Sequence, residues 1–189
     1  MKTTNIMIVG VGGQGSLLAS KLLGNLLVDE GYDVKVSEVH GMSQRGGSVV
    51  TYVKFGEKVY SPIVDTGECD YLIAFEKIEA ARYASYLKEG GKTIVNTQEI
   101  EPMPVITGAC DYPANALDKL CSLGLSVDSL DALTPAIEAG SAKAVNIILM
   151  GRLSKYMDIP EEKWINAIKK SVAPKFVELN LKAFELGRN

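Results

Sequence analysis

Residues 5–16 read NIMIVGVGGQGS, and this stretch decides the fold. Residues 5–10 form an apolar run that ends in glycine, which predicts a short buried strand. Gly10, Gly12 and Gly15 then match the pattern G-x-G-x-x-G directly after that strand. Leucines recur at helical spacing over residues 16–30, and a glycine follows as a stop signal. The stretch therefore predicts a strand, a glycine loop and a helix.

The next segment outward, residues 33–39, alternates and is rich in β-branched residues, which predicts a second strand. Strand, loop, helix and strand together have the size of a βαβ unit. Such crossovers are right-handed in nearly all cases, so a parallel sheet is expected. The predicted fold class is α/β, a doubly wound, mainly parallel, Rossmann-like sheet, with a β-hairpin and a helical C-terminal third.

The other expected elements follow from apolar periodicity and from glycine and proline positions. The hairpin is predicted from strands 49–55 and 58–61 around a turn at 56–57. Further strands are expected at 71–75 and 92–96, with a short edge strand at 105–107. The predicted helices cover residues 78–88, 114–123, 139–156, 160–170 and 174–186. No repeat or linker interrupts the chain, so residues 1–189 are interpreted as one domain.

Composition excludes several classes of function. The 189 residues have a net charge of −3, so no basic face for nucleic acid is expected. The N-terminal apolar run is too short for a signal peptide, and no run approaches the length of a membrane span. Cys69, Cys110 and Cys121 contain no Cys-x-x-Cys pair, which predicts no iron–sulfur or zinc site. A cytoplasmic protein that binds neither nucleic acid nor membrane and holds no metal is expected.

The first glycine loop is a candidate site for a phosphate or another anionic ligand. Glycine lets the backbone approach a ligand closely, and the following helix N-terminus offers unpaired N–H groups. Glu38, at the end of the second strand, has the position of the acid that binds ribose in dinucleotide folds. The alternative is that the glycines only allow close packing of helix and strand. The candidate residues of this loop are Gly10, Gly12, Gly13, Gln14 and Gly15.

A second polar glycine loop, HGMSQRGGS at residues 40–48, follows the second strand. We expect both loops at the carboxyl ends of adjacent parallel strands, where open α/β sheets bind ligands. The guanidinium of Arg45 suits phosphate or carboxylate, although it could instead pair with Glu38 or cap a helix. His40 is a candidate for proton transfer or a residue that orders the Gly41 turn. The candidate residues here are Glu38, His40, Gly41, Ser43, Gln44, Arg45, Gly46 and Gly47.

The two loops together resemble a known family. GVGGQG, followed by SEVHGMSQRGGSV, is similar to the gamma-type domain of pyruvate/2-oxoacid:ferredoxin oxidoreductases, and most of all to the small (beta) subunits of the indolepyruvate type. The resemblance extends to Asn146 within AVNIILMGRLS, to the helix with Trp164 and to the ending VELNLKAFELGR. It covers nearly the whole chain.

The resemblance implies a subunit that is inactive alone. Such enzymes decarboxylate a 2-oxoacid, here indolepyruvate or another arylpyruvate, on thiamine diphosphate. They pass electrons through iron–sulfur clusters to ferredoxin and release an acyl-coenzyme A. Thiamine diphosphate and the clusters are expected in a large partner subunit, with coenzyme A as co-substrate. This chain has neither a Gly-Asp-Gly motif nor a cysteine cluster, which fits a subunit that binds no cofactor by itself.

Two other functions stay open at this point. G-x-G-x-x-G with Glu38 is compatible with a stand-alone NAD(P)-dependent dehydrogenase, and the loops with a non-catalytic nucleotide- or coenzyme A-binding module. Glu76 and Asn96 also follow predicted strands and could face the same crevice or serve ordinary structural roles. Asn146 is a further candidate site residue, with close helix packing as its alternative. Trp164 is interpreted as a core or interface residue.

Overall fold

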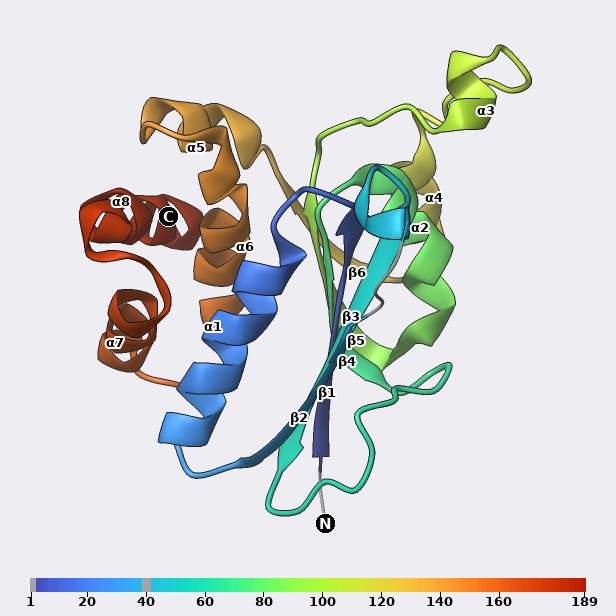
Figure 1. Ribbon diagram of the computed structural model, residues 1–189. Coiled ribbons are helices and arrows are strands. Elements are labelled where there is room, and N and C mark those ends of the chain that lie inside the picture. The colour runs from blue at the N-terminus through green and yellow to red at the C-terminus, as the bar shows by residue number, and fades with distance from the viewer. Residues whose placement is uncertain (1–2, 39–41) are drawn as a thin grey trace.

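The computed structural model describes residues 3–38 and 42–189. Within these ranges the strands form one six-stranded sheet in the order β2-β3-β1-β4-β5-β6. The strands are β1 (Thr3–Val11), β2 (Asp33–Glu38), β3 (Ser48–Gly56), β4 (Cys69–Ala74), β5 (Leu87–Asn96) and β6 (Ser126–Leu130). The sheet stands in the centre of the molecule with helices on both faces (Figure 1).

The sheet is mainly parallel, as predicted. β1, β4, β5 and β6 pair in parallel, while β3 is antiparallel to both β1 and β2. The expected adjacency of β1 and β2 is wrong, because β3 lies between them. β3 pairs with β1 along its whole length, from Thr3 opposite Gly56 to Val11 opposite Ser48. β3 therefore occupies the edge of β1 at which the second predicted strand, β2, was expected.

Two predicted strands are wrong, and one strand of the structure was not predicted. Residues 58–61, the predicted second strand of the hairpin, do not form a strand. The amide of Val59 instead donates to the Asp33 carboxylate at 2.9 Å. The antiparallel partners of β3 are β1 and β2. Residues 103–106 form helix α3 rather than an edge strand, since Pro104 favours a first helical turn. The edge strand β6 was missed because SVDSL lacks an apolar run.

Helices α1 and α6 cover one face of the sheet, and α2 and α4 cover the other (Figure 1). Helices α7 and α8 pack outside α1 and α6 as a further layer. The helices are α1 (Ser16–Asp29), α2 (Lys77–Tyr83), α3 (Met103–Ile106), α4 (Ala116–Ser122), α5 (Leu133–Glu138), α6 (Val145–Ser154), α7 (Glu161–Ser171) and α8 (Val177–Arg188). Among the described residues, none of these helices combines the length and apolarity that crossing a bilayer requires.

The apolar run at the start of the chain is explained by burial on both faces. Side chains along a strand alternate in direction, so Ile6 and Ile8 pack toward α1 and α6 while Met7 and Val9 pack toward the α2 face. All four are fully buried. A central strand of this kind has no polar face, which is why the run does not alternate in polarity.

The C-terminal layer depends on two glycines where α6 and α8 cross. A Cβ added at Gly151 would lie 2.2 Å from the carbonyl oxygen of Phe184, and one added at Gly187 would lie 2.0 Å from that of Ile148. The two backbones therefore touch directly. Trp164 of α7 is fully buried and stacks on Phe184 with ring centroids 5.9 Å apart, which confirms its interpretation as a core residue.

We expect Gly151→Ala to lower the free energy of unfolding by about 1–3 kcal/mol, because the added methyl group must separate α6 from α8. Gly24→Ala is the matched control, since the nearest atom to a Cβ there is Val36 Cγ2 at 3.9 Å. Helix propensity favours alanine at that position by up to about 1 kcal/mol. Urea unfolding followed by circular dichroism measures both, and equal stability of the two variants would contradict the packing argument.

Candidate functional site

The two glycine loops meet at the carboxyl end of β1. The amide of Gly12 donates to the carbonyl oxygen of Gly47 at 2.8 Å, directly beyond the last β1–β3 pair, Val11 and Ser48. The loops thus form one surface, as predicted. They are joined through the antiparallel strand β3, however, and not through adjacent parallel strands.

The first loop uses glycine for two different reasons. Gly13 and Gly15 have φ angles of 103° and 91°, in the left-handed region that side chains disfavour. Gly13 has no neighbouring atom within 4 Å of an added Cβ, so its side is open. Gly10 instead lies inside β1, where a Cβ would approach Phe75 Cβ to 2.9 Å. Close packing therefore explains Gly10, while the open face of the loop is at Gly13.

The side chain of Gln14 folds back and anchors the loop. Its Oε1 accepts from the amide of Val11 at 2.7 Å, and its Nε2 donates to the carbonyl oxygen of Phe75 at 3.1 Å. These two bonds connect the end of β1 to the residue after β4. The sequence singled out Gln14 as a loop residue, and the structure gives it a positioning role.

A second amide completes this connection across the sheet. Asn96, fully buried at the end of β5, donates to the carbonyl oxygen of Phe75 at 3.2 Å and accepts from the amide of Ala132 at 3.0 Å. Gln98 lies between the two amides and accepts from both at 3.4 Å. Asn96 therefore has a structural role, and Gln98 was not anticipated from the sequence.

Asn146 reaches the first loop from α6. Its Nδ2 donates to the carbonyl oxygen of Gly15 at 3.2 Å, and a Cβ at Gly15 would lie 2.8 Å from the same nitrogen. The side chain is only 3% exposed. The structure therefore brings this candidate residue to the loop, where it couples the start of α1 to α6 and adds a close contact to the left-handed φ that already favours glycine at position 15.

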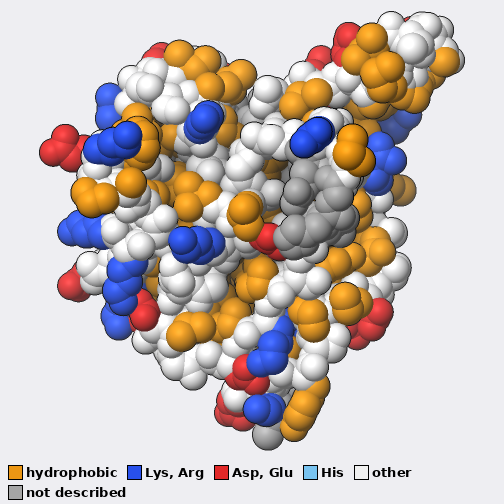
Figure 2. Space-filling view, viewed as in Figure 1, with side chains coloured by type: hydrophobic (Ala, Val, Ile, Leu, Met, Phe, Trp, Pro, Cys, Tyr) orange, Lys and Arg blue, Asp and Glu red, His pale blue; other side chains and the backbone are white. Residues whose placement is uncertain are grey.

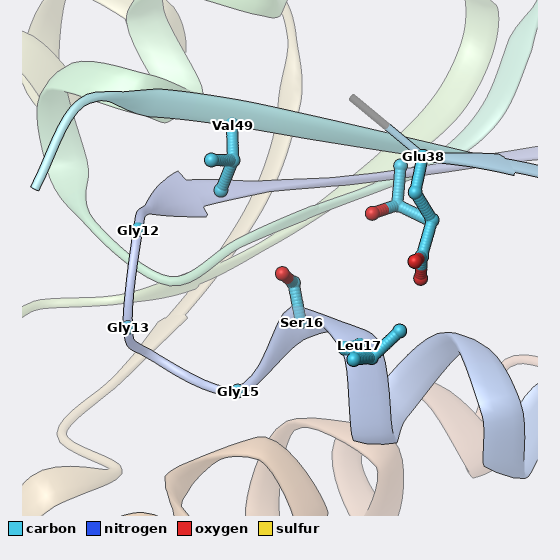
Figure 3. A pocket seen from close by; sticks show the side chains of 8 residues that line it. Gly12, Gly13, Gly15, Ser16, Leu17, Glu38 and Val49 are labelled. Atoms are coloured by element: carbon cyan, nitrogen blue, oxygen red, sulfur yellow. The ribbon is translucent and has the colours of Figure 1, made fainter. Parts of the chain in front are cut away.

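A cavity of about 260 Å³ lies between the first loop and the ends of β2 and β3. Figure 3 shows Glu38 and Val49 on one side and Ser16 and Leu17 of α1 on the other. The Glu38 carboxylate accepts from Ser20 Oγ at 2.6 Å, a partner not foreseen from the sequence. The lining residues are Gly12, Gly13, Gly15, Ser16, Leu17, Glu38, Val49 and Thr51.

A second cavity of about 460 Å³ lies on the helical side of the same loop. Gly13 and Gly15 border both cavities, so the loop is the wall between them. This cavity is largely apolar, and Phe176 contributes to its wall. Among the described residues that line it, the exposed Lys143 is the basic one. Its other lining residues are Gln14, Leu18, Ser141, Ala144, Asn146, Ser171, Val172, Ala173, Leu179 and Asn180.

The second loop is a tight structure where it is described. The amide of Gly47 donates to the carbonyl oxygen of Ser43 at 2.9 Å, and a Cβ at Gly47 would lie 2.8 Å from Ser43 Cα. Arg45 is exposed, and Gly46 has a left-handed φ of 88°. The candidates His40 and Gly41, and the side chain of Gln44, lie outside the described parts of the chain.

The candidate residue Glu76 has a structural role. Its carboxylate caps α2 by accepting from the amides of Ile78 at 2.7 Å and Glu79 at 3.1 Å, and it accepts a hydrogen bond from the Tyr112 hydroxyl. Burial, and then the bond to Glu76, raise the pKa of the Tyr112 hydroxyl above its ordinary value. Nearby, Ser48 hydrogen-bonds Glu79. This polar cluster therefore supports the start of β3 and of α2.

Burial lowers the reactivity of one of the three cysteines, Cys69. Desolvation raises the pKa of the Cys69 thiol to about 12, which disfavours the reactive thiolate. Cys110 and Cys121 are exposed and free. Within residues 3–38 and 42–189, no three His, Cys, Asp or Glu side chains are grouped in a way that could hold a metal ion.

We expect Gln14→Ala to reduce the free energy of unfolding by about 1–3 kcal/mol, because it leaves the Val11 amide without its partner and leaves the Phe75 carbonyl with only its bond from Asn96. Hydrogen exchange at residues 12–16 should accelerate at the same time. Gln98→Ala, which loses only the two 3.4 Å contacts, is the matched control. An equal or larger loss for the Gln98 variant would contradict the anchoring role of Gln14.

Comparison with known proteins gives relatives over nearly the full length. The chain is 45% identical to the indolepyruvate oxidoreductase subunit IorB of Thermococcus kodakarensis, over 99% of this chain and 95% of that protein. It is 44% identical to the subunit of the same name from Pyrococcus horikoshii, again over 99% and 95%. These relatives are subunits, so a partner chain is implied for this protein too.

Solved structures share the fold. The gamma subunit of a keto/oxoacid ferredoxin oxidoreductase from Geobacter sulfurreducens aligns with a TM-score of 0.71 and 24% identity, over 97% of this chain and 95% of that one. The 2-oxoglutarate:ferredoxin oxidoreductase of Magnetococcus marinus aligns with a TM-score of 0.76 and 20% identity, over all of this chain and 31% of that one. The model of the pyruvate ferredoxin/flavodoxin oxidoreductase family matches residues 5–189, and the chain belongs to this family.

Proposed function

We propose that this chain is the small subunit of a 2-oxoacid:ferredoxin oxidoreductase that acts on indolepyruvate or a related arylpyruvate. The observation that supports this most is the 45% identity to an indolepyruvate oxidoreductase subunit over 99% of the chain. In the complex, a large subunit would hold thiamine diphosphate and iron–sulfur clusters and pass electrons to ferredoxin. The small subunit would complete that enzyme without carrying out the oxidation itself.

The distribution of cofactors is supported by this chain's own residues. Its sequence has no Gly-Asp-Gly motif, and its three cysteines are widely spaced. Two of them are exposed, and the third is buried as a neutral thiol. Cluster ligation requires several thiolates at one place, which these positions do not offer.

The joined loops are the proposed contact for coenzyme A, the acyl acceptor. The helix α1 begins at Ser16, and the N-terminus of a helix offers unpaired backbone N–H groups to an anion beside residues 13–16. Arg45 is an exposed basic side chain of the second loop, and Lys143 is an exposed basic side chain that lines the helical cavity. The helical cavity adds an apolar wall. Anionic phosphates and an apolar pantetheine-like chain would find suitable surfaces here.

The alternative of a stand-alone NAD(P)-dependent dehydrogenase loses support from the sheet order. In a dinucleotide fold the ribose-binding acid ends the strand next to β1. Here β3 occupies that place, and Glu38 ends the strand beyond it while accepting a hydrogen bond from Ser20. Titration with NADH or NADPH at millimolar concentration distinguishes the two functions, since binding would favour the dehydrogenase.

Coexpression with the large subunit tests the proposal. We expect a stable complex that reduces ferredoxin in the presence of an arylpyruvate and coenzyme A, with neither subunit active alone. Full activity of the large subunit without this chain, or no complex at all, would overturn it.

Within that complex, we expect Arg45→Ala and Lys143→Ala each to raise the KM for coenzyme A about three- to tenfold, because each removes a cation near the proposed phosphate contacts. Lys155→Ala, an exposed lysine at the far end of α6, is the matched control and should leave the KM unchanged. Steady-state kinetics at varied coenzyme A measure this. An unchanged KM in both test variants would mean that the loops serve structure alone.

A further inference from the structure

An arm of residues 101–115 projects from the body of the protein between β5 and α4 (Figure 1). At its tip is α3, a helix of only 4 residues, closed by the bond from the Thr107 hydroxyl to the Met103 carbonyl oxygen at 2.9 Å. None of the residues 101–115 is buried. A single helical turn of this length is not stable by its own hydrogen bonds in water.

The exposed surface of this arm is apolar. Residues 102–110 read PMPVITGAC and contain no charged side chain. Met103 is 66% and Ile106 60% exposed. Figure 2 shows hydrophobic side chains grouped on the projecting part of the arm, beside uncharged polar and backbone atoms. A contiguous apolar surface of this kind is typical of an interaction site, whereas single exposed apolar residues are ordinary.

The arm is held in place at its base. The Glu76 carboxylate accepts from the amide of Ile100 at 3.3 Å and from the Tyr112 hydroxyl, so both ends of the arm are tied to one buried side chain. The remaining oxygen of Glu76 caps α2. An apolar surface that is fixed in direction loses less conformational entropy on binding than a disordered one.

The arm is continuous with the candidate site. A cavity of about 210 Å³ is bordered by Gly46, Gly47 and Ser48 of the second loop and by Pro102 and Met103 of the arm. A partner protein that covers the arm therefore also covers the end of the second loop. The exposed acids Glu101 and Asp111 flank the apolar segment and give it a negative rim.

We infer that the arm of residues 101–115 is the docking element for the large subunit, which offers it an apolar depression with a basic rim. The inference rests on the proposed function. The reacting centre of the enzyme belongs to another chain and must reach the glycine loops, and the arm stands beside the second of them. A second copy of this chain would bring no such centre, so it is not the occupant that the site requires.

The test compares two variants with matched exposure. Met103→Glu combined with Ile106→Glu places two charges in the proposed interface, and we expect it to weaken binding of the purified large subunit by more than about tenfold. Leu123→Glu is the control, because Leu123 is 74% exposed at the end of α4. It should bind like the wild type. Circular dichroism confirms that both variants are folded.

Hydrogen exchange on the unmodified protein provides a second measurement that does not depend on a variant. Amides of residues 103–110 should gain protection when the large subunit is added, and those of residues 119–125 should not. Unchanged exchange in the arm, or a folded double variant that binds within twofold of the wild type, would overturn the docking role while leaving the proposed function intact. A wild-type chain that binds no large subunit would overturn both. A wild-type dimer of this chain that the double variant dissociates would make a second copy the occupant and overturn the inference.

Discussion

The side-chain amide of Gln14 connects the parts of this structure on which the candidate site depends. Its oxygen accepts from the Val11 amide at the end of β1, and its nitrogen donates to the Phe75 carbonyl beyond β4, which also accepts from Asn96. Backbone groups at the carboxyl ends of central strands cannot continue the sheet ladder, and leaving them unpaired in a partly buried place is costly. By filling this role, Gln14 holds the first loop in a conformation whose open side faces outward at Gly13.

The second constraint is the position of β3. By pairing with β1 along its whole length, it carries the end of the second loop to the first loop and allows the bond between Gly12 and Gly47. The same placement moves Glu38 one strand outward from the position of a ribose-binding acid. The familiar glycine pattern therefore belongs here to a combined two-loop surface with a cavity on each side of the first loop. Such a surface suits a subunit whose chemistry is completed by another chain.

The parts of the fold that could be predicted are those governed by local rules. The strand β1 with its buried centre, the loop after it and α1 follow from an apolar run, glycines and leucine spacing. Pro160 and Pro174 marked the beginnings of the last helical segments correctly. The wrong or missing elements are peripheral: residues 58–61 are held by Asp33 rather than by a ladder, and β6 is an edge strand with little apolar signal.

The candidate site, too, was only partly predictable from the sequence. The sequence alone determined which residues are chemically suited to it, because the glycines with left-handed angles at 13, 15 and 46 cannot be replaced by residues with a side chain without strain. Only the tertiary structure decided what these residues adjoin. The contacts of Ser20 with Glu38, of Gln98 with Gln14 and of Asn146 with Gly15 join residues that are 18, 84 and 131 positions apart. Their meeting depends on strand order and on the packing of α6 against α1, and pairings between distant segments leave no periodic trace in the sequence.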